Sequence, residues 1–108
     1  MDLINILSDL RIPAAYGKFD KPPRPPFAVY LGAGQQRFFG DNTIFSKVND
    51  YTLEYYFVKK SEAREDELEA ALLANDYIYE KSEDDYIDED DIFVIYYTLW
   101  RKHKAAAE

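Results

Sequence analysis

Two segments of the chain repeat their apolar residues with the period of a helix. In residues 2–10 the apolar positions fall at i, i+3, i+4 and i+7, and they are Leu3, Ile6, Leu7 and Leu10. In residues 61–74 the expected buried stripe consists of leucines and alanines, which are Leu68, Ala70, Ala71, Leu72 and Ala74. Ser61 is a favourable N-cap for this second helix, and the acidic residues after it suit the positive end of a helix dipole. The pattern predicts an N-terminal helix and a central helix.

Other segments carry the patterns of strands. The candidates are residues 27–32, 43–47, 51–58, 77–81 and 92–101. Residues 51–58 alternate with period two, and residues 92–101 are apolar on both faces, which is typical of a central strand. Turn residues predict a break over residues 33–42 and a short turn at Asn49-Asp50. The order predicts an α+β fold, α-β-β-β-α-β-β, with helices on a mainly antiparallel sheet of about five strands.

The segment before the first of these strands is a proline-rich connection. Prolines at positions 22, 23, 25 and 26 favour an extended path, with Tyr16 and Phe19 as anchors of the loop. We interpret it as a stiff connector, and the alternative is a ligand for a proline-recognition domain. The length of 108 residues fits one domain, which we place at residues 1–102, followed by a frayed tail over residues 103–108.

Composition excludes several kinds of chemistry. The chain has no cysteine and a single histidine, His103, so disulfides, zinc–thiolate sites and multi-histidine metal sites are absent. Gly32-Ala33-Gly34 follows a strand, but neither a third glycine nor a Lys-Ser or Lys-Thr pair completes a phosphate-binding motif. Glu54 is the one acidic residue within an apolar strand, and no second carboxylate from a comparably apolar setting accompanies it. We therefore predict no catalytic residues, no cofactor and no enzyme activity.

The charge is concentrated in one block. The whole chain has 13 basic and 21 acidic residues, and 14 of the acidic ones lie within residues 61–91. A nucleic-acid binder normally has the opposite balance, because it must neutralise phosphates. Residues 83–91 contain seven carboxylates but lack the spacing and central glycine of a calcium loop, so we predict a solvated hairpin loop and no specific metal site. Weak cation binding or docking to a basic partner are the alternatives.

Aromatic residues point to assembly. Ten tyrosines exceed what one small core can bury with satisfied hydroxyl groups, and tyrosine is enriched at protein interfaces. The paired phenylalanines at the expected hairpin are the strongest candidate for a docking element, unless both fold back into the core. The candidate interface residues are Arg37, Phe38, Phe39, Asp41, Asn42, Tyr55, Tyr56 and Tyr96.

Several of these segments, taken in order, resemble a known group of proteins. They are Pro25-Pro26-Phe27, Phe38-Phe39, Asp41-Asn42, the run 51–56, the run 77–81 and the closing strand 93–97. The order is similar to that of small proteins from the head–tail gene clusters of tailed bacteriophages and prophages. These are variously called tail completion, tail terminator or head–tail joining proteins. The resemblance covers roughly residues 1–102.

The resemblance implies a structural protein of the virion without a cofactor. Such proteins typically close into six-membered rings at the upper end of the tail. The implied partners are copies of the chain itself, the tail tube and the head–tail connector proteins. The resemblance implies assembly in the host bacterial cytoplasm, with no membrane partner and no specific nucleic acid, although DNA passes through the ring. An acidic lumen would suit that passage, because a basic one would bind the phosphates. The alternative is an acidic DNA mimic, or another phage-encoded binding protein, that inhibits a host enzyme.

Overall fold

The computed structural model describes residues 2–40 and 43–101, with the backbone alone over residues 35–40 and 43–49. The helices are α1 (Leu3–Asp9) and α2 (Glu62–Ala74). The strands are β1 (Ala14–Tyr16), β2 (Phe27–Gly40), β3 (Thr43–Phe57), β4 (Tyr77–Lys81), β5 (Asp85–Ile87) and β6 (Ile92–Arg101). The expected α+β class is confirmed, although the sheet has six strands rather than about five.

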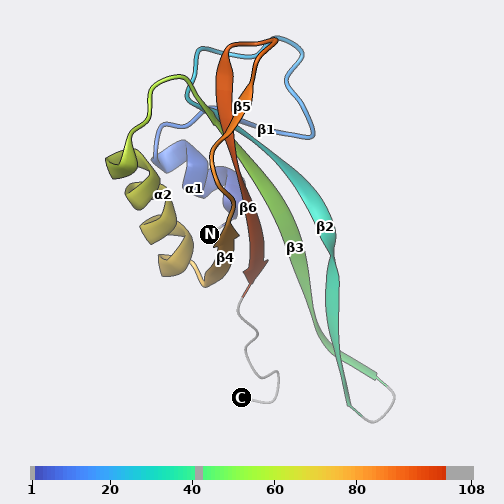
Figure 1. The fold of residues 1–108 in the computed structure, drawn as a ribbon. Helices are drawn as coiled ribbons and strands as arrows, with labels where there is room; N and C mark the ends of the chain where they lie inside the picture. The colour runs from blue at the N-terminus through green and yellow to red at the C-terminus, as the bar shows by residue number, and fades with distance from the viewer. Residues whose placement is uncertain (1, 41–42, 102–108) are drawn as a thin grey trace.

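The sheet is mostly antiparallel and is covered by helices on one face. Its strand order is β1-β2-β3-β6-β4, and β5 pairs with β6 beyond the end of β4. Only β1 and β2 run parallel. The two helices lie on the same side of the sheet (Figure 1). Strand β6 is central, as its apolar pattern predicts, because it has β3 on one side and β4 and β5 on the other.

The core lies between the helices and this face of the sheet. Its fully buried side chains include Ile6 and Leu7 of α1, Leu68 and Leu72 of α2, and Tyr97 of β6. Ser61 is the N-cap of α2, as expected, because its hydroxyl accepts a hydrogen bond from the backbone N–H of Arg64 at 3.3 Å.

The predicted composition of the buried stripe on α2 is partly wrong. Ala70 and Ala74 are exposed, and the buried residues of the helix are Glu65, Leu68 and Leu72. These three stand at i, i+3 and i+7 and therefore share one helix face, from which positions 70 and 74 are rotated away. A carboxylate thus occupies a core position that sequence patterning assigns to the polar side.

The predicted breaks in the first strands are also wrong. Strand β2 runs on to Gly40, and β3 is one strand from Thr43 to Phe57 that includes Asn49-Asp50. The pairing of β2 with β3 changes register between Gly32 and Gly34 and again between Phe38 and Phe39, and it continues past both places. Backbone pairing between two long strands satisfies donors and acceptors on both sides, so local turn signals become bulges rather than turns.

Two short strands escape the sequence pattern. Strand β1 lies in the segment expected to be a loop, and β5 lies within the acidic connection over residues 82–91. Each has three residues, which is too short for a period of two to stand out. Tyr86 of β5 packs its ring 5.0 Å from that of Phe93, so the acidic segment is anchored to the sheet.

Replacing Leu72 with alanine tests the packing of α2. Leu72 is fully buried, so Leu72→Ala should lower the free energy of unfolding by about 2–5 kcal/mol in a urea titration. Leu73→Ala is the matched control, because Leu73 is 56% exposed and should cost little. Equal losses from the two variants would contradict this placement of the helix.

Candidate interaction surface

The first component of the candidate surface is an arm formed by β2 and β3. Strand β6 pairs with β3 only from Tyr51 to Phe57, and β1 pairs with β2 only up to Tyr30. Among the described residues, the segments 34–40 and 43–50 therefore pair only with each other, and we call them the arm. The arm projects away from the helices and the rest of the sheet (Figure 1). An isolated two-stranded ribbon is marginally stable in water, so the arm would gain stability from a partner.

The arm contains several of the candidate residues from the sequence. Arg37 is paired with Lys47, Phe38 with Ser46 and Phe39 with Ile44. These candidates therefore lie on a paired strand rather than in the broad turn predicted over residues 33–42. Asp41 and Asn42 lie outside the described residues.

The three candidate tyrosines do not share one face of the sheet. Tyr55 is 2% exposed and packs in the core on the helix side. Tyr56 is half-buried and Tyr96 is 37% exposed. Because Glu54 is paired with Tyr96, and Tyr56 with Val94, these residues lie on the opposite face, which we call the open face. The structure thus places Tyr56 and Tyr96 on the open face and Tyr55 in the core.

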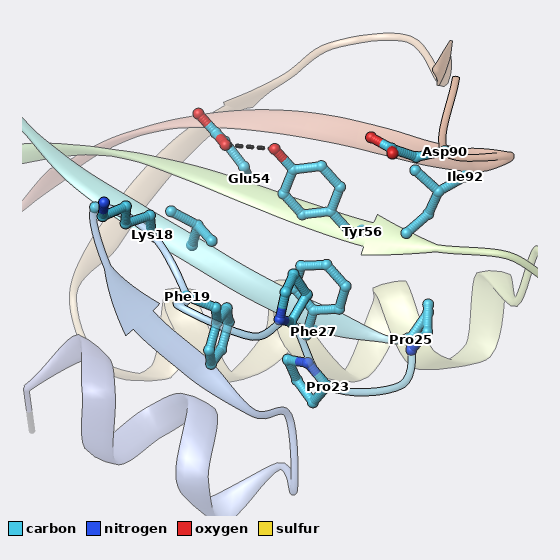
Figure 2. Close-up of a pocket in the computed structure, with 12 residues that line it drawn as sticks. Lys18, Phe19, Pro23, Pro25, Phe27, Glu54, Tyr56, Asp90 and Ile92 are labelled. Carbon is cyan, nitrogen blue, oxygen red and sulfur yellow. Dashed lines mark hydrogen bonds between the residues drawn. The ribbon is translucent and has the colours of Figure 1, made fainter. Parts of the chain in front are cut away.

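The second component is a pocket on the open face, at the end of β3 remote from the arm. Its volume is about 440 Å³, and the proline-rich segment before β2 folds over the sheet to form one wall (Figure 2). The ring of Phe19 meets Phe27 edge-on at 5.5 Å, and Phe27 stacks on Tyr56 at 4.9 Å. The lining residues are Gly17, Lys18, Phe19, Pro22, Pro23, Pro25, Phe27, Val29, Glu54, Tyr56, Asp90 and Ile92.

The polar groups of the pocket gather around Tyr56. Its hydroxyl donates a hydrogen bond of 2.7 Å to Oε1 of Glu54, and in Figure 2 the ring lies between Glu54 and Asp90. Burial raises the pKa of Tyr56, and the hydrogen bond to Glu54 and the negative charges of Glu54 and Asp90 raise it further. Tyr56 therefore remains a neutral donor, and Glu54 is held in place by it.

Sequence reasoning identified Tyr56 and singled out Glu54, but it did not predict the pocket. The residues that form one wall of the pocket were noted in the sequence as a proline run and as Phe19, which was expected to anchor a loop. The sequence does not indicate which face of the sheet the loop containing Phe19 packs against. The loop covers the half of the open face that lies under Phe27 and Tyr56, and it leaves Tyr96 exposed.

The acidic block is partly neutralised inside the fold. The side chain of Glu65 is 1% exposed, and Nζ of Lys60 lies 2.9 Å from each of its two oxygens. Lys81 donates a second hydrogen bond of 2.9 Å to Oε1, whereas Oε2 is held by charge without a well-directed hydrogen bond. Lys60 also binds Asp84 at 3.1 Å. Glu65 is therefore neutralised by lysines inside the fold, whereas Asp84 pairs with Lys60 at the surface.

Glu69 extends this network along α2. It accepts hydrogen bonds from the hydroxyls of Tyr97 at 2.7 Å and Tyr79 at 3.2 Å, and Lys81 lies 2.8 Å away. Burial acts to raise the pKa of Glu69, but the bonds from Lys81 and Tyr97 outweigh it and hold that pKa below its usual value. Burial and the contact with Glu69 raise the pKa of Tyr97. The network fastens α2 to β4 and β6.

Comparison with protein families and with curated protein sequences finds no match to this chain. In residues 2–40 and 43–101, no three His, Cys, Asp or Glu side chains are grouped so that they could hold a metal ion. No helix in this part of the chain is both long and apolar enough to cross a membrane.

The lowered pKa of Glu69 predicts a pH dependence of stability. A carboxyl whose folded pKa lies below its unfolded value, near 4.5, stabilises the fold above that value and loses the effect as pH falls through the folded pKa. Glu69→Gln should therefore lower the urea midpoint at neutral pH, and its difference from the wild type should shrink below pH 4.5. Glu67→Gln, on an exposed position of the same helix, is the control. A difference that stays constant with pH would contradict the role of Glu69.

Proposed function

We propose that this protein is a structural subunit that assembles with copies of itself through the arm. Within the limits of the resemblance described above, the assembly is a ring, with six copies expected, that joins or terminates the tail at the head–tail interface of a phage or prophage virion. The observation that carries the proposal is the arm itself.

The arm is long enough to contact a neighbouring subunit. The seven residues from Gly34 to Gly40 span about 24 Å at about 3.4 Å per residue, while the molecule measures 52 × 25 × 23 Å. An arm of this length can cross the whole width of an adjacent subunit. Five of its 15 residues are bulky and apolar in sequence, namely Phe38, Phe39, Ile44, Phe45 and Val48. A ribbon with this composition and no third strand among the described residues is suited to docking.

The distribution of charge supports a head-to-tail arrangement. The acidic segment around β5 lies at the end of the molecule opposite the arm (Figure 1), and the arm contains the basic residues Arg37 and Lys47 and one acidic residue, Asp50. Identical subunits that present unlike ends to each other form rings when the rotation closes.

The DNA-mimic alternative receives less support. A mimic must display carboxylates at phosphate-like spacing over a broad surface. Here Glu65 and Glu69 are turned toward Lys81, and Asp84 is paired with Lys60. These three carboxylates are therefore engaged by lysines of the same chain.

Solution mass and two arm variants test the assembly. The wild-type chain should sediment as an oligomer larger than a dimer. At least one of Phe38→Ser and Phe39→Ser should remain folded by circular dichroism yet lose the oligomer. Val58→Ser, at a position 55% exposed on the body, is the control and should assemble normally. A monomeric wild type, or normal assembly of both arm variants, would overturn the proposal.

Electron microscopy of phage particles tests whether this protein acts at the head–tail joint. A nonsense mutation in this reading frame, introduced into the phage or prophage that encodes it, should yield separate filled heads and tails, or tails of abnormal length. A lysate of intact, infectious particles would show that the chain is not needed at the head–tail joint.

A further inference from the structure

We propose that the pocket beneath Phe19, Phe27 and Tyr56 receives the arm of a second copy, with the basic residues of that arm facing Glu54 and Asp90. This inference rests on the proposed self-assembly and names the surface that the arm contacts. It assigns a ligand class to the pocket, namely a basic and aromatic β-ribbon of the same chain.

The arm of a subunit cannot reach the pocket of that subunit. Tyr56 and Thr43 are 13 positions apart on the one strand β3, which corresponds to about 44 Å at about 3.4 Å per residue. The arm continues β2 and β3 away from the rest of the sheet rather than folding back over it (Figure 1). An arm that occupies the pocket must therefore belong to another copy. A contact between unlike ends of identical subunits is heterologous, which is the type that closes into rings.

The pocket is suited to a cation with an apolar stem. Phe19, Phe27 and Tyr56 supply aromatic walls, on which a guanidinium group can stack. The hydroxyl of Tyr56 engages only Oε1 of Glu54. Within the described part of the chain, no lysine or arginine forms an ion pair with Glu54 or Asp90. Two carboxylates at an aromatic pocket are thus available to an incoming positive charge.

The arm has the complementary chemistry. Its register brings Arg37 and Lys47 to the same pair position. Arg37 and Lys47 give the arm two positive charges, which attract an anionic partner. Phe38 and Phe39 follow Arg37 in sequence, so the arm also carries aromatic residues. Charge and apolar content therefore match between the arm of one copy and the pocket of the next.

A complementation experiment tests the inference. Arg37→Glu disables the arm and leaves the pocket intact, whereas Glu54→Arg disables the pocket and leaves the arm intact. Each variant alone should sediment as a monomer. An equimolar mixture should form oligomers in which the two variants alternate, because the arm of each variant has the opposite charge to the pocket of the other. The double variant Arg37→Glu/Glu54→Arg should regain part of the wild-type oligomer. Glu80→Arg, at an exposed position on the same open face, is the matched control and should leave assembly unchanged.

The outcomes separate this inference from the proposed function. If Phe39→Ser or Phe38→Ser is monomeric but Glu54→Arg assembles as the wild type does, the arm docks elsewhere and the pocket assignment is wrong. If the wild type itself is monomeric, both proposals fall. Should Glu54→Arg fail to fold, Glu54→Gln combined with Asp90→Asn removes the two charges without adding bulk. That pair should weaken assembly by about tenfold or more, and unchanged assembly would overturn the inference.

Discussion

The structure depends on how the charge of Glu65 is neutralised inside the fold. A buried carboxylate is costly unless cations and hydrogen bonds compensate it. Here Lys60 approaches from the segment that enters α2, and Lys81 approaches from the last residue of β4. Because both lysines must meet one carboxylate, the helix is fixed against the sheet at a defined depth and β4 is held beside it. Removing one lysine would leave a buried charge only partly compensated, so the network constrains geometry as well as stability.

Because α2 is held on one face of the sheet, the two faces differ in how far they are covered. With α1 and α2 on one face, the proline-rich segment is the part of the described chain that covers the other face. It covers Phe27 at one end and leaves Tyr96 exposed. The pocket forms where that segment meets the sheet. The arm arises because β2 and β3 run on past the last residues that pair with β1 and β6. The open face and the projecting ribbon are the two features on which our proposal of contact between copies of the chain rests.

The sequence predicted those parts of the fold in which a local pattern agrees with the tertiary environment. Both helices and the central position of β6 follow from periodicity, and Ser61 as the N-cap follows from hydrogen-bonding chemistry. The predictions were wrong where a long-range contact outweighs a local signal. Asn49-Asp50 has the composition of a turn, yet pairing with β2 keeps it within a strand. Glu65 is of a residue type usually found at the surface. Its burial is allowed by Lys60 in the preceding segment and by Lys81, which is distant in sequence.

The candidate surface was likewise predictable in residue type but not in long-range placement. Tyr56 and Tyr96 could be selected from their residue type, but the face on which each tyrosine lies depends on register, and Tyr55 packs in the core for that reason. The pocket required the path of the loop bearing Phe19, which no local pattern specifies.

The most direct measurement is disulfide crosslinking between the arm and the pocket. The chain contains no cysteine, so Gln35→Cys on the arm and Lys18→Cys at the pocket would carry the only thiols. Under mild oxidation the double variant should give a ladder of linked chains on a denaturing gel, because each subunit joins two neighbours. Each single variant can link two chains at most. A double variant that gives only monomers and dimers, like the single variants, would contradict the account.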